Sequence, residues 1–463
     1  MTSMDQTTQQ YDIIIIGFGK AGKTFAKAAS KQGKKVAVVE RSAAMYGGTC
    51  INIACIPSKT MVVASNQGLS FDDAMARKHS VVTALNGKNY HMLADDENID
   101  VIDGVARFAS NNVVDVFASD ESDDSDAAAT DPAHAQKPLR TLTAEHIIIN
   151  TGATSIVPDI PGLRDSRYML TSTEALDLEH MPKRTVIIGG GYIALEFASM
   201  LNTFGSEVTV LERSEKLMPR EDAEIAAQAV ADLKSAGVHF ELGVDTLSVE
   251  DGESSVTVHT SAGDFEGEAV LVATGRSPRT QGLGLENTDI RTGERGEVLV
   301  NEKLETTAPG VYAVGDVTGG PQFTYISLDD FRILRSQFFG QGERTTANRG
   351  HIPYSVFITP TLSRIGLTFA QAQEQGLDVV ENSVPVNTIP RHKINNDPRG
   401  LFKVVVDRTS QEIVGASLYG AQSEELINYL KMAMDNHIPY TYVRDAIFTH
   451  PTMSESFNDL LNI

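Results

Sequence analysis

Residues 11–22 read YDIIIIGFGKAG, and this stretch decides the fold of the 463-residue chain. The apolar run at residues 11–16 is typical of a strand buried in a parallel sheet, and it is too short to span a membrane. It leads into the pattern Gly-x-Gly-x-x-Gly, which opens a helical stretch. A second apolar strand, residues 36–39, then ends at Glu40. Strand, glycine turn, helix, second strand and terminal acid together form the complete fingerprint of a dinucleotide-binding fold.

Each of the three glycines and the terminal acid of this fingerprint has a physical role. Gly17 permits the tight turn, and Gly19 lets a pyrophosphate approach the N-terminus of the helix. Gly22 lets the helix pack closely on the strand, and Glu40 would accept hydrogen bonds from the two hydroxyls of an adenosine ribose. We therefore predict a bound dinucleotide here, in preference to an ordinary glycine-rich turn of an α/β protein.

The same unit recurs in the middle of the chain. Residues 184–188, Arg-Thr-Val-Ile-Ile, lead into Gly189, Gly190 and Gly191; a helical stretch follows, and the next strand ends at Glu212. The step from first glycine to terminal acid is 23 residues in both copies, from 17 to 40 and from 189 to 212. Two such units predict two bound dinucleotides.

The only two cysteines, Cys50 and Cys55, lie five residues apart. In a regular helix they would be about 7.5 Å apart along the axis and on different faces, whereas disulfide Cα atoms approach to roughly 4.4–6.8 Å. The segment must therefore begin as a loop or a distorted turn, and Pro57, which cannot donate a backbone hydrogen bond, adds irregularity. We predict a redox-active, easily reduced pair rather than buried packing thiols, a zinc site or a structural disulfide.

Two dinucleotide units beside a dithiol indicate two cofactors and a path for electrons to sulfur. One dinucleotide is expected to be a tightly held flavin and the other an exchangeable nicotinamide. Because the chain has no cysteine beyond this pair, electrons must pass directly from the pair to a small acceptor that can enter the cleft.

Four motifs follow one another in the order that one enzyme family shows. They lie at residues 47–59, 273–276, 314–316 and 450–455. In these motifs the chain resembles the class I pyridine nucleotide-disulfide oxidoreductases, which include lipoamide dehydrogenase, glutathione reductase and mercuric reductase. Five further stretches resemble a bacterial subgroup implicated in resistance to reactive chlorine, and they are residues 16–24, 44–48, 315–320, 322–330 and 447–451. Hypothiocyanite reduction and Cu(II) or Hg(II) reduction are the activities attached to that subgroup.

The resemblance implies an α/β fold of the glutathione reductase kind, with two Rossmann-like dinucleotide-binding domains and a C-terminal α+β dimerisation domain. The expected parts are a first FAD-binding part at residues 1–155, an NAD(P)H-binding domain at 156–276, a return to the FAD-binding or central domain at 277–350, and the dimerisation domain at 351–463. Strand patterns at residues 402–406 and 413–416, together with two helical stretches, fit the last of these.

The resemblance also implies roles for four residues. Hydride would pass from the nicotinamide to the flavin, and the reduced flavin would open the disulfide. Cys55 would face the flavin as a thiolate, and Cys50 would face the substrate. His450 would take and return the proton, with Glu455 fixing its tautomer. In the family this His–Glu pair comes from the partner subunit, so a homodimer is expected.

Further residues are expected to contact the cofactors. By resemblance, Lys59 would lie beside the flavin. We hypothesise that Glu196 pairs with Lys59, and Asp316 would bind the ribityl chain. Glu212 would bind the ribose of NADH and repel the extra phosphate of NADPH, although Arg213 could pair with that phosphate. NADH is therefore the expected cofactor, with NADPH possible. The remaining expected contacts are Gly48, Thr49, Val105, Thr151, Gly152, Gly189, Gly191, Gly275 and Gly315.

Composition excludes some partners and leaves three functions open. With 39 basic and 61 acidic residues the formal charge is −22, which argues against nucleic acid and anionic membranes. No signal peptide or membrane span is evident, so a cytoplasmic enzyme is expected. The open functions are a reductase of a small oxidant such as hypothiocyanite, a Cu(II)/Hg(II) reductase or lipoamide dehydrogenase-like reductase, and a flavin redox sensor without turnover. The acidic, low-complexity residues 119–132 are expected to form a mobile hairpin tip.

Overall fold

The computed structural model describes residues 8–119 and 137–463, and its first sheet is built around the opening apolar run. The strand order is β3-β2-β1-β6-β5-β4, with β17 also paired to β6. Strands β1, β2, β3, β6 and β17 are parallel, whereas β4 and β5 are antiparallel additions. The bounds are β1 Gln9–Ile16, β2 Val36–Glu40, β3 Ile99–Asp103, β4 Val105–Ser110, β5 Val113–Phe117, β6 Arg140–Ile149 and β17 Val311–Ala313.

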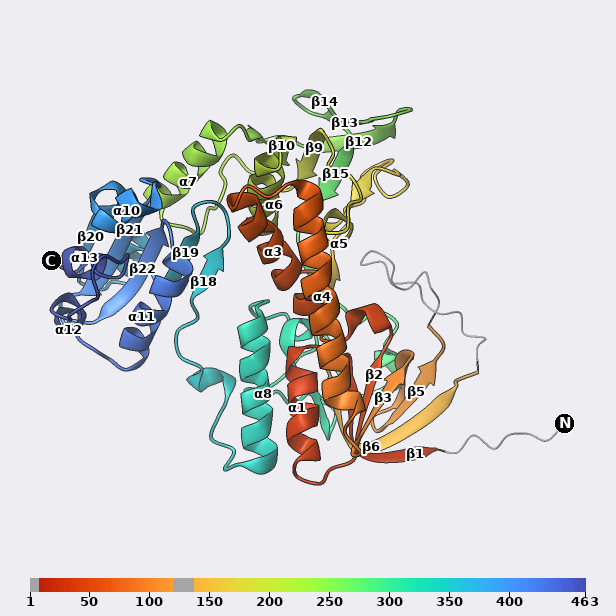
Figure 1. Cartoon of the computed structure of the whole chain (residues 1–463). Coiled ribbons are helices and arrows are strands. Elements are labelled where there is room, and N and C mark those ends of the chain that lie inside the picture. The colour runs from red at the N-terminus through yellow and green to blue at the C-terminus, as the bar shows by residue number, and fades with distance from the viewer. Residues whose placement is uncertain (1–7, 120–136) are drawn as a thin grey trace.

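Helices α1 and α8 lie side by side along this sheet (Figure 1). Phe25 of α1 contacts Phe338 and Phe339 of α8, with ring centroids 5.1 and 5.7 Å apart. The apolar residues of β1 are buried on both faces, as the sequence predicts for a central parallel strand. The helices of this part are α1 Lys20–Ser30, α2 Thr49–Asn52, α3 Cys55–Asn66, α4 Phe71–Ala94 and α8 Thr324–Phe339.

The second glycine motif belongs to a five-stranded parallel sheet of order β11-β10-β9-β15-β8. A three-stranded antiparallel sheet, β12-β13-β14, accompanies it. The strands are β8 Met169–Leu170, β9 Arg184–Ile188, β10 Glu207–Glu212, β11 His239–Leu242, β12 Thr246–Asp251, β13 Val256–Thr260, β14 Gly263–Gly267 and β15 Ala269–Val272. The helices are α5 Ser172–Ala175, α6 Tyr192–Thr203 and α7 Ala223–Ser235.

The chain enters and leaves this second unit through one short ribbon. Strand β7, Ala153–Ser155, pairs antiparallel with β16, Arg276–Pro278. The ribbon brings the segment after β6 next to the segment after β15, so both crossings lie at the same place.

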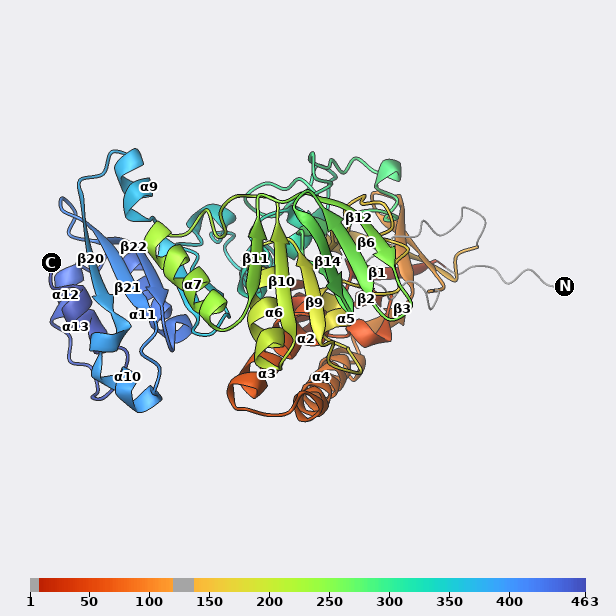
Figure 2. The ribbon, with the colours of Figure 1, turned by 90° about the horizontal axis from the view of Figure 1, so that it is seen from above.

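The C-terminal sheet has the order β18-β19-β22-β21-β20 and is antiparallel throughout. Figure 2 shows α7 between the second sheet and this one, and the hydroxyl of Tyr419 on β22 donates to Asp232 on α7 at 2.8 Å. The strands are β18 Tyr354–Val356, β19 Leu362–Gly366, β20 Val379–Pro385, β21 Leu401–Asp407 and β22 Ile413–Tyr419. The helices are α9 Phe369–Glu374, α10 Pro390–Asn395, α11 Ser423–Asp435, α12 Tyr440–Arg444 and α13 Ser456–Leu460.

The C-terminal helices and the acidic segment differ in how far the structure describes them. The sequence analysis predicted two helical stretches in the C-terminal part, but the structure has five helices there. Four of them have only five or six residues. Such short helices carry too few turns for apolar periodicity to reveal them. Strands β5 and β6, which flank the acidic segment, pair with Val116 opposite Arg140. Most of the acidic segment, from residue 120 onward, lies outside the described residues, so its hairpin-tip conformation stays a prediction.

Among residues 8–119 and 137–463, no helix combines the length and the apolar character that a membrane span requires.

A stability prediction follows from the second glycine turn. Gly189 and Gly205 both have left-handed φ values, +106° and +100°. A Cβ at Gly189 would lie 2.6 Å from the carbonyl oxygen of Ala273, whereas a Cβ at Gly205 would meet nothing within 4 Å. Gly205→Ala should therefore cost only the left-handed strain of about 1–2 kcal/mol. Gly189→Ala should cost about 1–3 kcal/mol more, because the neighbouring strand must also shift.

Urea unfolding of the two variants, without added nicotinamide, measures this difference. Equal midpoints for Gly189→Ala and Gly205→Ala would contradict the steric argument, because the backbone strain is shared and only the collision differs.

Candidate active site

The first glycine turn is closed by backbone and side-chain atoms of Asn150. A Cβ at Gly17, whose φ is +99°, would lie 2.5 Å from the Asn150 carbonyl oxygen. A Cβ at Gly19 would lie 2.6 Å from the Asn150 side chain. At Gly22 it would lie 2.7 Å from Ile15, which agrees with the predicted role of Gly22 in packing helix on strand. Only glycine therefore fits this turn.

Glu40 lies at the end of β2, where the sequence predicts a ribose-binding acid. Its carboxylate accepts hydrogen bonds from the backbone N–H groups of Phe18, Arg41 and Ser42, at 2.8, 2.9 and 3.3 Å. Burial raises the pKa of Glu40, and these three donors oppose that shift. The carboxylate is thus held against the glycine turn.

The dithiol lies where two short helical segments meet. Cys50 belongs to α2, and Cys55 is the first residue of α3. The helix is broken between them at Ile53 and Ala54, and Ala54 has φ −142° and ψ −105°. The predicted distortion is therefore present. Pro57 lies in the first turn of α3, where its missing N–H leaves no intrahelical bond unmade.

The two thiols are unbridged in this structure and hydrogen-bond to each other. The bond from Cys50 is the main cause that lowers the pKa of Cys55, with help from the hydroxyl of Thr324 and the charge of Lys59. The same bond and burial raise the pKa of Cys50. The negative charge of the pair is therefore held on Cys55, the sulfur for which the sequence predicts a thiolate.

Lys59 and Glu196 form the ion pair that the sequence analysis expects. Lys59 Nζ is 2.6 Å from Glu196 Oε2, and the ammonium also lies over the ring of Phe357, 4.7 Å from its centroid. The other carboxylate oxygen of Glu196 accepts from the backbone N–H of Phe357 at 2.8 Å. The pair ties α3, which carries Cys55, to α6, which begins at the second glycine motif.

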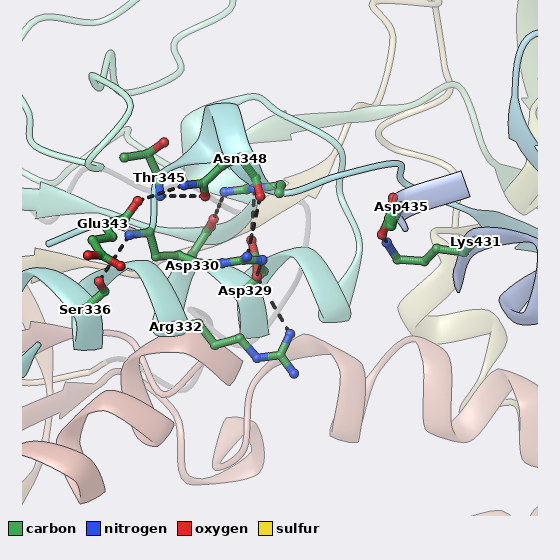
Figure 3. A network of polar contacts seen from close by, with 11 residues as sticks. Asp329, Asp330, Arg332, Ser336, Glu343, Thr345, Asn348, Lys431 and Asp435 are labelled. Atoms are coloured by element: carbon green, nitrogen blue, oxygen red, sulfur yellow. Dashed lines mark hydrogen bonds and ion pairs between the residues drawn. The ribbon is translucent and has the colours of Figure 1, made fainter. Parts of the chain in front are cut away.

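The turn at Gly315 is bound to a network of charged side chains, in which Figure 3 shows Asp329 and Asp330. Its N–H donates to Asp330 Oδ2 at 2.7 Å, and Asp330 Oδ1 lies 2.5 Å from Arg349 Nη2. The adjacent Asp329 binds Arg344 at 2.5 Å and Arg349 at 3.1 Å. Burial raises the pKa of Asp330 to about 6, and the charge of Arg349 opposes that shift. Through the bond from Gly315 to Asp330, the network holds the backbone of the Val-Gly-Asp motif in place.

Asp316, the residue after this turn, faces the cavity. Burial raises the pKa of its carboxyl group. Among the described residues, no hydrogen bond reaches its carboxylate oxygens. A hydroxyl-bearing ligand would supply the missing partner, and this is the contact predicted with a ribityl chain.

One cavity of about 2340 Å³ joins these features. Ordinary ligand pockets measure roughly 300–1,000 Å³, so this cavity has room for an extended dinucleotide. An added Cβ at Gly191 would meet no protein atom within 4 Å, and at Gly152 it would meet only Thr49 Oγ1 at 4.0 Å. The predicted site residues on its wall are Gly17, Gly19, Glu40, Gly48, Thr49, Cys50, Cys55, Lys59, Val105, Thr151, Gly152, Gly191, Glu196, Gly275, Gly315 and Asp316.

Three predicted nicotinamide residues lie off this wall. Gly189 forms the turn after β9, as described above, and Glu212 ends β10. The Glu212 carboxylate accepts from the N–H groups of Gly190 at 2.5 Å and Ser214 at 2.7 Å. Glu212 thus binds the second glycine turn as Glu40 binds the first. The third residue, Arg213, is exposed.

His450 and Glu455 contact each other but not the dithiol of their own chain. His450 Nδ1 is 2.7 Å from Glu455 Oε2. Neither residue lines the cavity that holds Cys50 and Cys55. They precede α13, which lies at the far end of the C-terminal part from α3 in both views (Figures 1 and 2). One chain alone therefore does not assemble all four predicted catalytic residues.

Two residues beside the dithiol had no assigned role in the sequence analysis. Thr324 contacts Cys55 from the start of α8, 269 positions away. Lys23 is buried and donates to the carbonyl of Gly47 at 2.8 Å, and burial lowers its pKa to about 8. No local pattern identifies either contact. For Lys23, one feature of the sequence could have indicated the contact. This charged residue directly follows Gly22, which was predicted to pack against the strand.

Comparisons with known proteins match the chain over nearly its whole length. The family profile described as pyridine nucleotide-disulphide oxidoreductase matches residues 11–330, and the profile of its dimerisation domain matches residues 352–461. The probable pyridine nucleotide-disulfide oxidoreductase RclA of Escherichia coli (strain K12) is 46% identical over 98% of this chain and 99% of its own length. A mercuric reductase of Staphylococcus aureus is 34% identical over 96% of this chain and 81% of its own length.

A solved structure has the same fold over nearly the whole chain. It is described as the Cu(II) complex of the HOCl-induced flavoprotein disulfide reductase RclA from Escherichia coli, and it superposes with a TM-score of 0.92 over 98% of this chain and 99% of that chain. The chain belongs to the pyridine nucleotide-disulphide oxidoreductase family.

Proposed function

We propose that this oxidoreductase uses FAD and NADH to keep the Cys50–Cys55 pair reduced, and that the pair reduces a small oxidant, with hypothiocyanite as the first candidate. The observation that carries the proposal is the placing of two hydrogen-bonded thiols on the wall of one cavity that both glycine motifs also reach. The family implies FAD and a nicotinamide dinucleotide. The solved RclA is described as HOCl-induced, which supports an oxidant as acceptor.

The proposed roles divide the site between the two cofactors. On the flavin side, the glycines, Glu40 and Asp316 bind and orient the dinucleotide, and Lys59, held by Glu196, places a positive charge at its reactive ring. On the other side, Gly189, Gly191 and Glu212 bind the nicotinamide dinucleotide. We also propose that the FAD-binding, NAD(P)H-binding, central and dimerisation parts of the chain meet at residues 155, 276 and 350. When bound, the flavin would relay an electron pair from NADH to the disulfide.

Turnover of the dithiol can be written with all atoms and electrons in balance. The Cys50 thiolate attacks the sulfur of HOSCN, an S–S bond forms to give Cys50–S–SCN, and hydroxide leaves and is protonated to water. Cys55 then attacks the Cys50 sulfur, which forms the disulfide and releases thiocyanate. The oxidant gains two electrons, and the two thiols lose them.

We propose that His450 returns and removes the proton at Cys50, and that Glu455 holds its ring. Since these two residues lie far from the dithiol of their own chain, the pair must come from a second copy. Exposed apolar side chains on the same C-terminal part support such a homodimer, among them Met432, Tyr442 and Ile447, which is fully exposed. A catalytic dithiol that must return to its reduced form suits the reducing cytoplasm, where we place the enzyme.

Reduction of a metal ion is a second candidate, because one relative is named a mercuric reductase and a similar solved structure is described as a Cu(II) complex. With two cysteines in the whole chain, no second cysteine pair can relay a metal ion to the site. A metal ion would have to reach Cys50 and Cys55 from solution.

An acceptor panel tests the proposed function. NADH oxidation is measured with hypothiocyanite, lipoamide, oxidised glutathione and Cu(II) in parallel, each with an enzyme-free control. Hypothiocyanite should give the highest kcat/KM, and Cys50→Ser should lower it at least about 100-fold because the attacking thiolate is lost. A faster reaction with lipoamide or glutathione, or an unchanged rate in Cys50→Ser, would contradict the proposal.

Subunit complementation tests the origin of the proton relay. Cys50→Ser and His450→Ala homodimers should each be inactive. After random reassortment of the two chains, about a quarter of the wild-type activity should return, since half of the dimers then carry one intact site. Cys50→Ser mixed with Cys55→Ser is the matched control. It should stay inactive, because each of the two dithiols in the heterodimer then lacks one cysteine. No recovery in proven heterodimers would mean that each chain completes its own site.

Nicotinamide preference tests the role of Glu212. NADH should be preferred over NADPH about tenfold in kcat/KM, equivalent to roughly 1.4 kcal/mol, because Glu212 repels the extra phosphate. Glu212→Gln should shrink this ratio, Arg213→Ala should increase it, and Glu215→Gln, a nearby exposed control, should leave it unchanged. Steady-state kinetics with both cofactors at one pH gives the ratio. A preference for NADPH would show that Arg213 outweighs Glu212.

A further inference from the structure

The hydroxyl group of Thr324 lies against the dithiol, and all three residues line the same cavity. Its oxygen is 3.6 Å from Cys55 Sγ. Thr324 also favours the thiolate form of Cys50, because it lowers the pKa of that thiol. One neutral hydroxyl therefore contacts the Cys55 sulfur and also favours negative charge on Cys50.

The position of Thr324 is fixed by its neighbours. It is the first residue of α8, and the rings on either side of it, Phe323 and Tyr325, stack with centroids 5.1 Å apart. Phe323 also stacks on Tyr354 at 6.2 Å, and the Tyr325 hydroxyl donates to the carbonyl of Pro353. These contacts join the start of α8 to the segment before β18, so the hydroxyl is presented by a rigid support.

The start of α8 is also electrostatically suited to a negative sulfur. The N–H groups of the first turn of a helix have no intrahelical acceptor, and they point toward the region before the helix. In α8 these include the N–H groups of Thr324 and Tyr325. The Thr324 hydroxyl adds a directed donor to this positive end.

Other charges around the sulfur atoms oppose one another. At Cys55, Lys59 on α3 favours the thiolate, whereas Glu196 on α6 disfavours it, and these two groups already pair with each other. Tyr325 on α8 also interacts electrostatically with Cys55. At Cys50, Lys23 on α1 favours the thiolate, and burial disfavours it. A neutral donor that needs no counter-charge is therefore a significant part of what holds the negative charge.

Building on the proposed function, we propose that Thr324 is a catalytic residue whose hydroxyl donates a hydrogen bond to whichever sulfur carries the negative charge, Cys55 at rest and Cys50 during attack on the acceptor. The charge must change sulfur during turnover, because Cys50 attacks first and Cys55 resolves the product. A hydroxyl that contacts Cys55 and favours the thiolate of Cys50 would follow the charge by rotating its O–H bond, with no movement of the backbone. Threonine suits this task because its branched side chain holds χ1 while its proton stays free.

The test uses holoenzyme in which Cys50 is replaced by Ser, because Cys55 is then the only thiol in the chain. The long-wavelength absorbance of the Cys55 thiolate beside the flavin is recorded against pH, and its midpoint reports the pKa of Cys55. Adding Thr324→Val should raise this midpoint by about one pH unit, the shift expected when a thiolate loses one hydrogen bond. Thr324→Ala, a second variant without the hydroxyl, should shift it in the same direction.

Two matched variants in the same background separate the hydroxyl from packing. Thr324→Ser keeps the hydroxyl and should leave the midpoint within about 0.3 pH units of the parent. Thr60→Val makes the same substitution on α3, where the hydroxyl donates to the carbonyl of Ile56 at 2.8 Å, and should also leave it unchanged. A shift in Thr324→Ser as large as that in Thr324→Val would overturn the proposal.

The rate of Cys55 alkylation by iodoacetamide, followed by mass against pH, gives an independent midpoint. Thr324→Val should displace it by the same amount. If both hydroxyl-free variants leave the two midpoints in place, the assignment of Thr324 is wrong. If no long-wavelength absorbance appears at any pH but the alkylation midpoint still moves, the assignment of Thr324 holds and the proposed placing of Cys55 at the flavin fails.

Discussion

The close backbone contact between Gly48 and Gly19 is the constraint on which the rest of the site depends. A Cβ at Gly48 would lie 2.7 Å from the Cα atom of Gly19, and Gly48 has a φ of +83°. The redox loop can therefore rest on the dinucleotide turn only while both positions lack side chains. The amide of Asn52 donates to the carbonyl of Gly48 at 3.0 Å, and Lys23 donates to that of Gly47. These bonds hold Cys50 and Cys55 at a fixed distance from whatever the turn binds.

Helix α8 completes the site from the other side, with three polar residues at intervals of three. Thr324 contacts the dithiol, Ser327 accepts from the N–H of Ala21 at 3.2 Å, and Asp330 accepts from the N–H of Gly315. One face of one helix thus meets the redox centre, the first glycine turn and the Val-Gly-Asp turn. A buried carboxylate is costly unless it is paired, and Arg349 is the pairing cation for Asp330. The polar face therefore serves position more than stability.

Local patterns predicted most of the frame and little of what joins its parts. The two strand–glycine–helix units, their terminal acids Glu40 and Glu212, and the distorted turn at the dithiol follow from spacing within about 25 residues, and the family match agrees with the fold. The pair of Lys59 with Glu196 was a hypothesis that no spacing in the sequence supports. The contact of Thr324 with Cys55 spans 269 positions, and no periodicity or motif encodes it. Short C-terminal helices were missed because five or six residues hold less than two turns.

The ribbon of β7 and β16 has a consequence for how such enzymes diversify. Because Ala153–Ser155 and Arg276–Pro278 are neighbours, the 120 residues between them leave and rejoin the flavin-side fold at a single gateway. A segment with adjacent ends can be replaced as a cassette without tearing the sheet that hosts it. Replacement of this segment during evolution would change the specificity for the electron donor and leave the thiol chemistry unchanged. The two properties can therefore evolve independently.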